Sequence, residues 1–217
     1  MYASRRRVTL PDPRSRPPFV VDLTPHLDAC WVLDRTSDPE QGTTLVGDLI
    51  ADVRVRPMQR VTAALAARMA DTVELIGGVD DLVVVPVPSA NPAAEVLARA
   101  VACSLELPFE RLVRSRWATR FAPPEEHFTV RARQVPTSVL LVDDLVRTGG
   151  SMRGCAARLR RRGVVDVWGI AAAADLDASS PDTASLALRA RTRRLVTDAS
   201  RQSSSVSSIP SIPSTMR

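Results

Sequence analysis

The strongest constraint on the fold comes from residues 139–171, where two apolar runs flank a segment with helical spacing of its apolar residues. The runs at 139–142 and 164–171 are mostly continuous rather than alternating, which is typical of strands buried on both faces of a parallel sheet. Gly163 follows the helical segment where a C-terminal cap is expected. Because parallel strands joined by a helix form a right-handed β-α-β unit, the sequence predicts an α/β fold.

The same alternation of apolar runs and helical segments extends toward the N-terminus. Residues 82–87 predict another buried strand, and Asn91–Pro92 supply a cap and first turn for the next helix. A further helix is predicted after Pro57, and short runs at 19–23 and 30–33 predict strands. We therefore expect an open, twisted, mostly parallel sheet of about five strands with helices on both faces.

Length and composition predict one domain with flanking segments. A chain of 217 residues with 45% hydrophobic residues suffices for one medium-sized core. In chain order we expect a flexible basic, proline-rich arm (1–18) and then a domain (19–175). The domain consists of a small hood (about 19–56) and a core (about 57–175). After it we expect a segment (176–198) with a short helix at 183–196, and a disordered Ser/Pro-rich tail (199–217).

All 29 basic residues of the chain are arginine, so lysine is absent. This absence excludes a Walker-A NTPase, a protein kinase and an enzyme that binds pyridoxal phosphate as a Schiff base, because each needs a lysine. A GC-rich genome is one explanation of the arginine bias, and a preference for phosphate or nucleic-acid partners is another. The formal net charge of +5 alone therefore adds little support for a nucleic-acid partner.

Patterns for export, membrane insertion and metal binding are missing from the sequence. There is no apolar run of about 18 residues, and the basic N-terminus precedes no apolar segment. Cys30, Cys103 and Cys155 form no C-x-x-C pair, and His26 lies far from His127. We expect a cytoplasmic protein with no membrane contact, disulfide scaffold or zinc module.

Two aspartates and a glycine turn follow the run at 139–142. Asp143 and Asp144 are expected at the carboxyl edge of the sheet, where open α/β sheets bind ligands and where carboxylates accept hydrogen bonds from vicinal hydroxyls. The Thr-Gly-Gly-Ser turn at 148–151 opens a helix, whose free N–H groups and dipole favour an anion. The spacing suits a ribose 5-phosphate lying across the turn.

Other structures are compatible with parts of this segment. An apolar strand ending in acids resembles a Walker-B strand or the acidic pair of a receiver domain, but both need a lysine that the chain lacks. A strand–turn–helix with solvated acids and no ligand also remains an alternative.

The 13 residues 139–151 resemble the phosphoribosyl pyrophosphate (PRPP) motif of type I phosphoribosyltransferases: four apolar residues, two acids and a Thr-Gly-Gly-Thr/Ser loop. The wider order resembles the ComF-type, competence-associated branch, with Val-Pro-Val-Pro at 85–88, a helix at 93–102 and Leu-Val-Arg-Ser-Arg at 112–116. The similarity covers about 45–175 and is strongest over 139–171.

The resemblance implies a site for PRPP. The residues matched to PRPP binding are Asp143, Asp144, Leu145, Val146, Arg147, Thr148, Gly149, Gly150 and Ser151. The turn matched to the pyrophosphate-binding loop is Pro88, Ser89, Ala90 and Asn91. Candidates in a mobile loop that closes over the site are Arg114, Arg116 and Arg120. Mg²⁺ would be held through PRPP near the two aspartates, with no direct protein metal site, and homodimers are common in such proteins.

The sequence departs from the family at three places. It lacks the four-cysteine zinc module and the basic stretch that ComF-type proteins carry after the Val-Pro-Val-Pro strand. Arg147 stands where purine-salvage relatives have an aspartate that acts as a base, a role that arginine cannot take. This disfavours hypoxanthine-guanine salvage and leaves the catalytic base unidentified.

The resemblance implies transfer of the ribosyl C1 of PRPP to a nitrogen nucleophile, with release of pyrophosphate and assistance from Mg²⁺. The alternative is a regulatory or competence-related protein that binds PRPP or a nucleotide without turnover. In that case the arm, the arginine-rich segment at 110–137 and the tail would contact nucleic acid or a protein. A third hypothesis is a fold that no longer binds a phosphoribosyl ligand.

Overall fold

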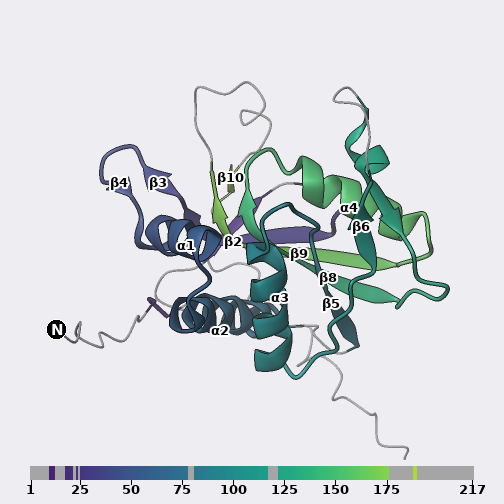
Figure 1. Ribbon diagram of the computed structural model, residues 1–217, viewed down its shortest axis with the longest axis horizontal. Helices are drawn as coiled ribbons and strands as arrows, with labels where there is room; N and C mark the ends of the chain where they lie inside the picture. The colour runs from purple at the N-terminus through teal and green to yellow at the C-terminus, as the bar shows by residue number, and fades with distance from the viewer. Residues whose placement is uncertain are drawn as a thin grey trace, which may run out of the picture.

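The computed structural model describes residues 10–12, 18–21, 23, 25–77, 81–116, 122–175 and 188–189. The expected tail and most of the expected arm lie outside these residues. In the described part of the chain, a six-stranded sheet forms in the order β10-β1-β2-β9-β8-β5 (Figure 1).

Four neighbouring strands of this sheet run parallel. They are β2 (Ala29–Arg35), β9 (Asp166–Ala174), β8 (Ser138–Val146) and β5 (Leu82–Pro86). At the other edge β1 (Phe19–Val21) pairs antiparallel with β2, and β10 (Leu188–Arg189) pairs antiparallel with β1. The predicted α/β class and mostly parallel sheet are confirmed, with an antiparallel edge that the sequence analysis did not predict.

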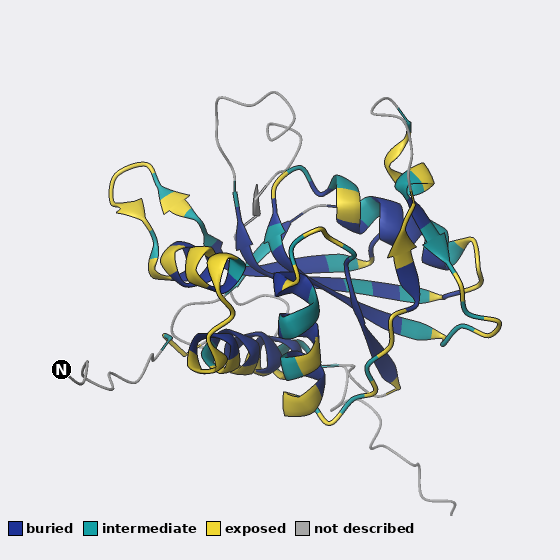
Figure 2. Ribbon diagram, viewed as in Figure 1, coloured by how far each residue is buried: buried dark blue, intermediate teal, exposed yellow. Residues whose placement is uncertain are grey.

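Helices cover both faces of the sheet, as predicted. On one face lie α1 (Leu45–Val55), α2 (Gln59–Ile76) and α3 (Ala93–Ser104), whose buried side chains pack with Leu140 and Ile170 of the sheet. On the other face, α4 (Gly150–Arg160) packs through Met152 and Cys155 against Leu141. The parallel strands β2, β5, β8 and β9 between these layers are mostly buried (Figure 2), which explains their continuous apolar runs.

A small hairpin completes the layer around α4. It consists of β6 (Val113–Ser115), η1 (Pro124–His127) and β7 (Phe128–Val130), and the two strands pair antiparallel. The arginine-rich sequence at 110–137 has no dominant period, because its strands have only three residues each. Val113 and Phe128 nevertheless reach the core on the α4 side.

The two aspartates lie inside β8 rather than after it. The apolar run predicts a strand that ends at residue 142, because aspartate is disfavoured in strands. The ladder with β9 instead continues through Asp143↔Ala171 and Leu145↔Ala173 to Val146↔Ala174. Pairing with the alanine-rich end of β9 therefore overrides the local preference and keeps both carboxylates in the sheet.

The expected hood at 19–56 is wrong for most of its length. Its strands β1 and β2 belong to the main sheet, where Cys30 and Val32 are fully buried. Only the β3 (Ser37–Asp38) and β4 (Gly42–Thr43) hairpin and α1 follow the carboxyl end of β2. Helix α1 is not predicted by the sequence pattern; its N-cap Thr44 accepts a 3.0 Å hydrogen bond from the Gly47 amide.

The helix expected at 183–196 is contradicted where the structure describes it. Leu188 and Arg189 form β10, opposite Val21 and Val20 of β1. The other residues of 176–198 lie outside the described part of the chain.

We predict that Gly154→Ala destabilises the protein by about 1–3 kcal/mol, because the site has no room for a larger residue. A Cβ at this position would lie 2.5 Å from the carbonyl oxygen of Pro124 and 2.9 Å from Cδ2 of Phe128. Urea unfolding measures the change. Gly150→Ala in the same helix is the matched control, because its Cβ meets Thr148 Oγ1 at 3.4 Å. Equal stability of the two variants would contradict this account of how α4 packs on η1.

Candidate functional site

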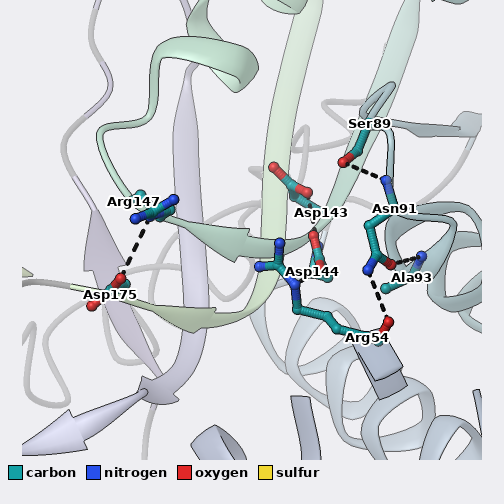
Figure 3. A network of polar contacts seen from close by, with 8 residues as sticks. All are labelled: Arg54, Ser89, Asn91, Ala93, Asp143, Asp144, Arg147 and Asp175. Carbon is teal, nitrogen blue, oxygen red and sulfur yellow. Dashed lines mark hydrogen bonds and ion pairs between the residues drawn. The ribbon is translucent and has the colours of Figure 1, made fainter. Parts of the chain in front are cut away.

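The carboxylates of Asp143 and Asp144 lie together near the carboxyl end of β8 (Figure 3). Their residues are 6% and 4% exposed. The amide of Asp144 donates a 2.9 Å hydrogen bond to Oδ1 of Asp143, which fixes the first carboxylate against the backbone. Two acids are thus held close together in a nearly dry environment.

This environment changes the protonation of the groups around Asp143. Burial, which has the largest effect, and the negative charge of Asp144 together raise the pKa of Asp143 well above its usual range. Burial also has the largest effect on the Cys30 and Cys155 thiols, and together with the negative charge of Asp143 it raises their pKa values. Both thiols are therefore protonated at neutral pH and are poor nucleophiles.

Arg54, which the sequence analysis did not single out, reaches the acid pair from the last turn of α1. Its Nε lies 3.5 Å from Oδ2 of Asp144. That oxygen accepts no hydrogen bond from the described residues. Nothing near Asp144 in the sequence indicates this partner, because α1 comes to β8 only through the tertiary fold.

The glycine turn after β8 has the geometry of an anion cradle. Gly149 is left-handed, with φ +71°, and immediately precedes Gly150, the first residue of α4. The Thr148 hydroxyl accepts a 3.3 Å hydrogen bond from the Gly150 amide, and the Arg153 guanidinium donates a 2.9 Å bond to the Thr148 carbonyl. The turn is therefore held in place from both sides at the positive end of the α4 dipole.

A pocket of about 420 Å³ opens above this turn. Eight of the nine predicted PRPP-binding residues line it, whereas Asp144 does not; the full lining is Asp143, Leu145, Val146, Arg147, Thr148, Gly149, Gly150, Ser151, Met152 and Asp175. The structure therefore brings together one carboxylate of the pair and the whole glycine turn.

Asp175 is a second residue that the sequence analysis missed. It follows β9, and its amide donates a 2.9 Å hydrogen bond to the Val146 carbonyl. Its Oδ2 lies 3.5 Å from Nε of Arg147 (Figure 3). The available sequence signal was its position directly after a buried strand, since parallel strands end at one edge of the sheet.

A second pocket of about 320 Å³ lies at the end of β5. It contains Pro88, Ser89 and Asn91 of the predicted pyrophosphate loop and Arg114 of the predicted mobile loop, but not Ala90 or Arg116. Arg120 lies outside the described residues. Arg116 directly follows β6, and its amide donates a 2.7 Å hydrogen bond to the carbonyl of His127.

The charges around the second pocket are partly neutralised within the protein. Glu95, which lines it, forms an ion pair with Arg111 and a 3.1 Å ion pair with Arg99. The hydrogen bond from Arg111 lowers the pKa of Glu95 despite the cost of burial. An anion in this pocket would therefore meet Arg114 and an Arg111 that already has a partner.

The arginine-rich segment 158–162, called the arginine run, lies at the end of α4 and binds other parts of the same chain. Arg158 donates to the carbonyl of Glu125 and Arg162 to that of Ala132. Arg160 donates to the carbonyl of His26 and forms a 2.7 Å ion pair with Asp28. These contacts assign the run a structural role and lend no support to a nucleic-acid surface there.

No protein-family model matches the chain, and a search of curated proteins finds no match. None of the helices in the described residues is long and apolar enough to cross a membrane. Within the same residues, no three His, Cys, Asp or Glu side chains are grouped to hold a metal ion.

We predict that Asp143→Asn stabilises the protein increasingly as the pH rises from about 4 toward neutrality. The unfolded chain ionises this carboxyl near its ordinary pKa of about 3.9, whereas the folded chain ionises it only at a higher pH. Unfolding in that interval releases a proton, so native stability falls with rising pH until the folded pKa is passed. The variant lacks this loss, so its stability relative to the native protein increases with pH across that interval.

Urea unfolding at several pH values measures this difference. The control is Asp52→Asn, at an exposed position of α1. A stability difference between native and Asp143→Asn proteins that does not change with pH would contradict the prediction.

Proposed function

We propose that the chain is a PRPP-dependent phosphoribosyltransferase, which transfers the ribosyl C1 to a nitrogen nucleophile and releases pyrophosphate. The observation that carries the proposal is that one pocket contains both the Asp143 carboxylate and the Thr-Gly-Gly-Ser turn at the start of α4. A carboxylate that accepts hydrogen bonds from hydroxyls and a cradle for phosphate are the two groups that a ribose 5-phosphate requires.

The second pocket supports a place for the pyrophosphate. When the bond between C1 and the pyrophosphate oxygen breaks, positive charge develops on the ribose ring and negative charge on the leaving group. Arg114 lies in the pocket beside residues 88–91, where a cation stabilises that negative charge. The Asp143 carboxylate in the first pocket is suited to the ribose side of the reaction.

The acid pair also fits the Mg²⁺ that enters with PRPP as part of the substrate. Carboxylate oxygens are the ligands that Mg²⁺ prefers, and Oδ2 of Asp144 accepts no hydrogen bond from the described residues. Bound to PRPP, Mg²⁺ supplies charge neutralisation for the leaving pyrophosphate. Asp143 and Asp144 are the residues near which it would be held.

Asp175 is our candidate for the group that accepts the proton from the nitrogen nucleophile. It is the carboxylate other than Asp143 in the lining of the first pocket. Its 3.5 Å ion pair with Arg147 and a 3.4 Å hydrogen bond from the Thr36 hydroxyl hold it at the end of β9. As the N–C1 bond forms, the proton on the nitrogen would pass to this carboxylate.

A protein that binds PRPP without turnover is the second candidate. The observation that favours it is the Glu95–Arg111 ion pair, which reduces the positive charge available to a pyrophosphate leaving group in the second pocket. Binding and turnover must therefore be measured separately.

We predict that the native chain binds PRPP in the presence of Mg²⁺ and that Asp143→Asn/Asp144→Asn abolishes this binding in calorimetry. Gly150→Ala should weaken binding about tenfold, because a methyl group at the cradle hinders the approach of phosphate. Its unfolding curve controls for damage to the fold. If the native chain gives no heat at millimolar PRPP, the proposal fails.

We also predict that a panel of nitrogen nucleophiles includes one that releases pyrophosphate from PRPP. With that acceptor, Asp175→Asn should lower kcat by about 100-fold, because general base catalysis contributes about 10²–10⁴, with little change in PRPP binding. Tight PRPP binding with no pyrophosphate release from any acceptor would contradict the transferase proposal and favour a protein that binds PRPP without turnover. An unchanged kcat in Asp175→Asn would show that Asp175 does not accept the proton from the nucleophile.

A further inference from the structure

We propose that Arg54 is a positioning residue that connects the two halves of the PRPP site, the acid pair on β8 and the loop at 88–91. The inference rests on the proposed function, because it assigns a ligand to both halves. It concerns a residue of α1, a helix outside the motif that suggested the site.

The side chain of Arg54 makes the first of the two connections. Its Nε lies 3.5 Å from Oδ2 of Asp144, and the two side chains are 36% and 5% exposed. Asp144 is thus a buried acid whose Oδ2 accepts no hydrogen bond from the described residues. Because an uncompensated buried charge is costly, the guanidinium fixes where this carboxylate lies.

The main chain of Arg54 makes the second connection. Its carbonyl oxygen accepts a 2.9 Å hydrogen bond from Nδ2 of Asn91 (Figure 3). Oδ1 of Asn91 accepts a 2.9 Å bond from the Ala93 amide. Asn91 therefore binds a carbonyl in the last turn of α1 and an amide in the first turn of α3, both of which lack partners inside their own helices.

The rest of α1 is too well anchored for Arg54 to move freely. Val46, Leu49, Ile50 and Val53 are buried in the core on this face of the sheet. Thr44 caps the helix at its start. A rigid helix end that contacts Asp144 with its side chain and Asn91 with its backbone fixes the distance between the acid pair and the 88–91 loop.

PRPP would extend across both halves, with ribose at the acid pair and pyrophosphate at the loop. Its affinity should therefore depend on their spacing. Losing either connection alone releases that constraint, so losing both should cost less than the sum of the two separate losses. This non-additivity is the property that a merely local role of Arg54 would not produce.

The test is a double-mutant cycle measured by calorimetry with PRPP and Mg²⁺. Asp144→Asn removes the charge that Arg54 holds, and Asn91→Ser removes the donor to the Arg54 carbonyl while keeping a hydroxyl that caps α3. The cycle is measured with Arg54 present and again in Arg54→Gln. Arg54→Lys tests whether another cation at this position restores PRPP binding. The matched control is Arg56→Gln, at an exposed position two residues further along the chain.

With Arg54 present, we expect the effects of Asp144→Asn and Asn91→Ser on the dissociation constant to be coupled by about fivefold. In Arg54→Gln the coupling factor should fall to about one, which means that the two effects are independent. Arg54→Gln alone should weaken binding about tenfold, Arg54→Lys should recover most of that loss, and Arg56→Gln should leave binding unchanged within about twofold. Additive effects with Arg54 present, coupling that persists in Arg54→Gln, or equal losses in Arg54→Gln and Arg56→Gln would each overturn the assignment.

A native chain that binds no PRPP would overturn the proposed function instead. The same cycle is then measured on the equilibrium constant for urea unfolding, which needs no ligand. About fivefold coupling that disappears in Arg54→Gln would support the connection through Arg54. Additive effects on unfolding would overturn it as well.

Discussion

The parallel pairing of β8 with β9 is the constraint on which the rest of the structure depends. The ladder runs from Ser138↔Asp166 to Val146↔Ala174, and most of its residues are buried. Strands without access to water must satisfy their N–H and C=O groups through each other, so their register is fixed. That register brings the ends of both strands to one edge, where the Asp175 amide bonds to the Val146 carbonyl and the glycine turn begins.

Features encoded by neighbouring residues could be predicted from the sequence. The apolar runs predicted β5, β8 and β9, and the Thr-Gly-Gly-Ser turn predicted the start of α4, because each signal lies within a few residues. Eight of the nine residues assigned to PRPP binding also line one pocket. The PRPP function itself remains a prediction.

Features that depend on distant pairing could not be predicted in this way. The run at 30–33 was identified as a strand, but nothing local indicated that it pairs with β9 in the main sheet. Asp143 and Asp144 were expected after their strand, because aspartate prefers loops. In the structure, pairing with β9 outweighs that preference. Arg54 and Asp175 were missed since neither forms a motif, and both reach the site through elements that the fold brings together.

The pairing of β1 with β10 has a consequence for any shortened form of the protein. β10 covers the outer edge of β1, although the two strands lie near opposite ends of the chain. Cutting the chain after Asp175 would remove β10 and leave the N–H and C=O groups on the outer edge of β1 without ladder partners, while the pairing of β1 with β2 would remain. Open strand edges readily pair with other chains, so a fragment that keeps all of residues 139–151 would acquire a surface prone to edge-to-edge aggregation.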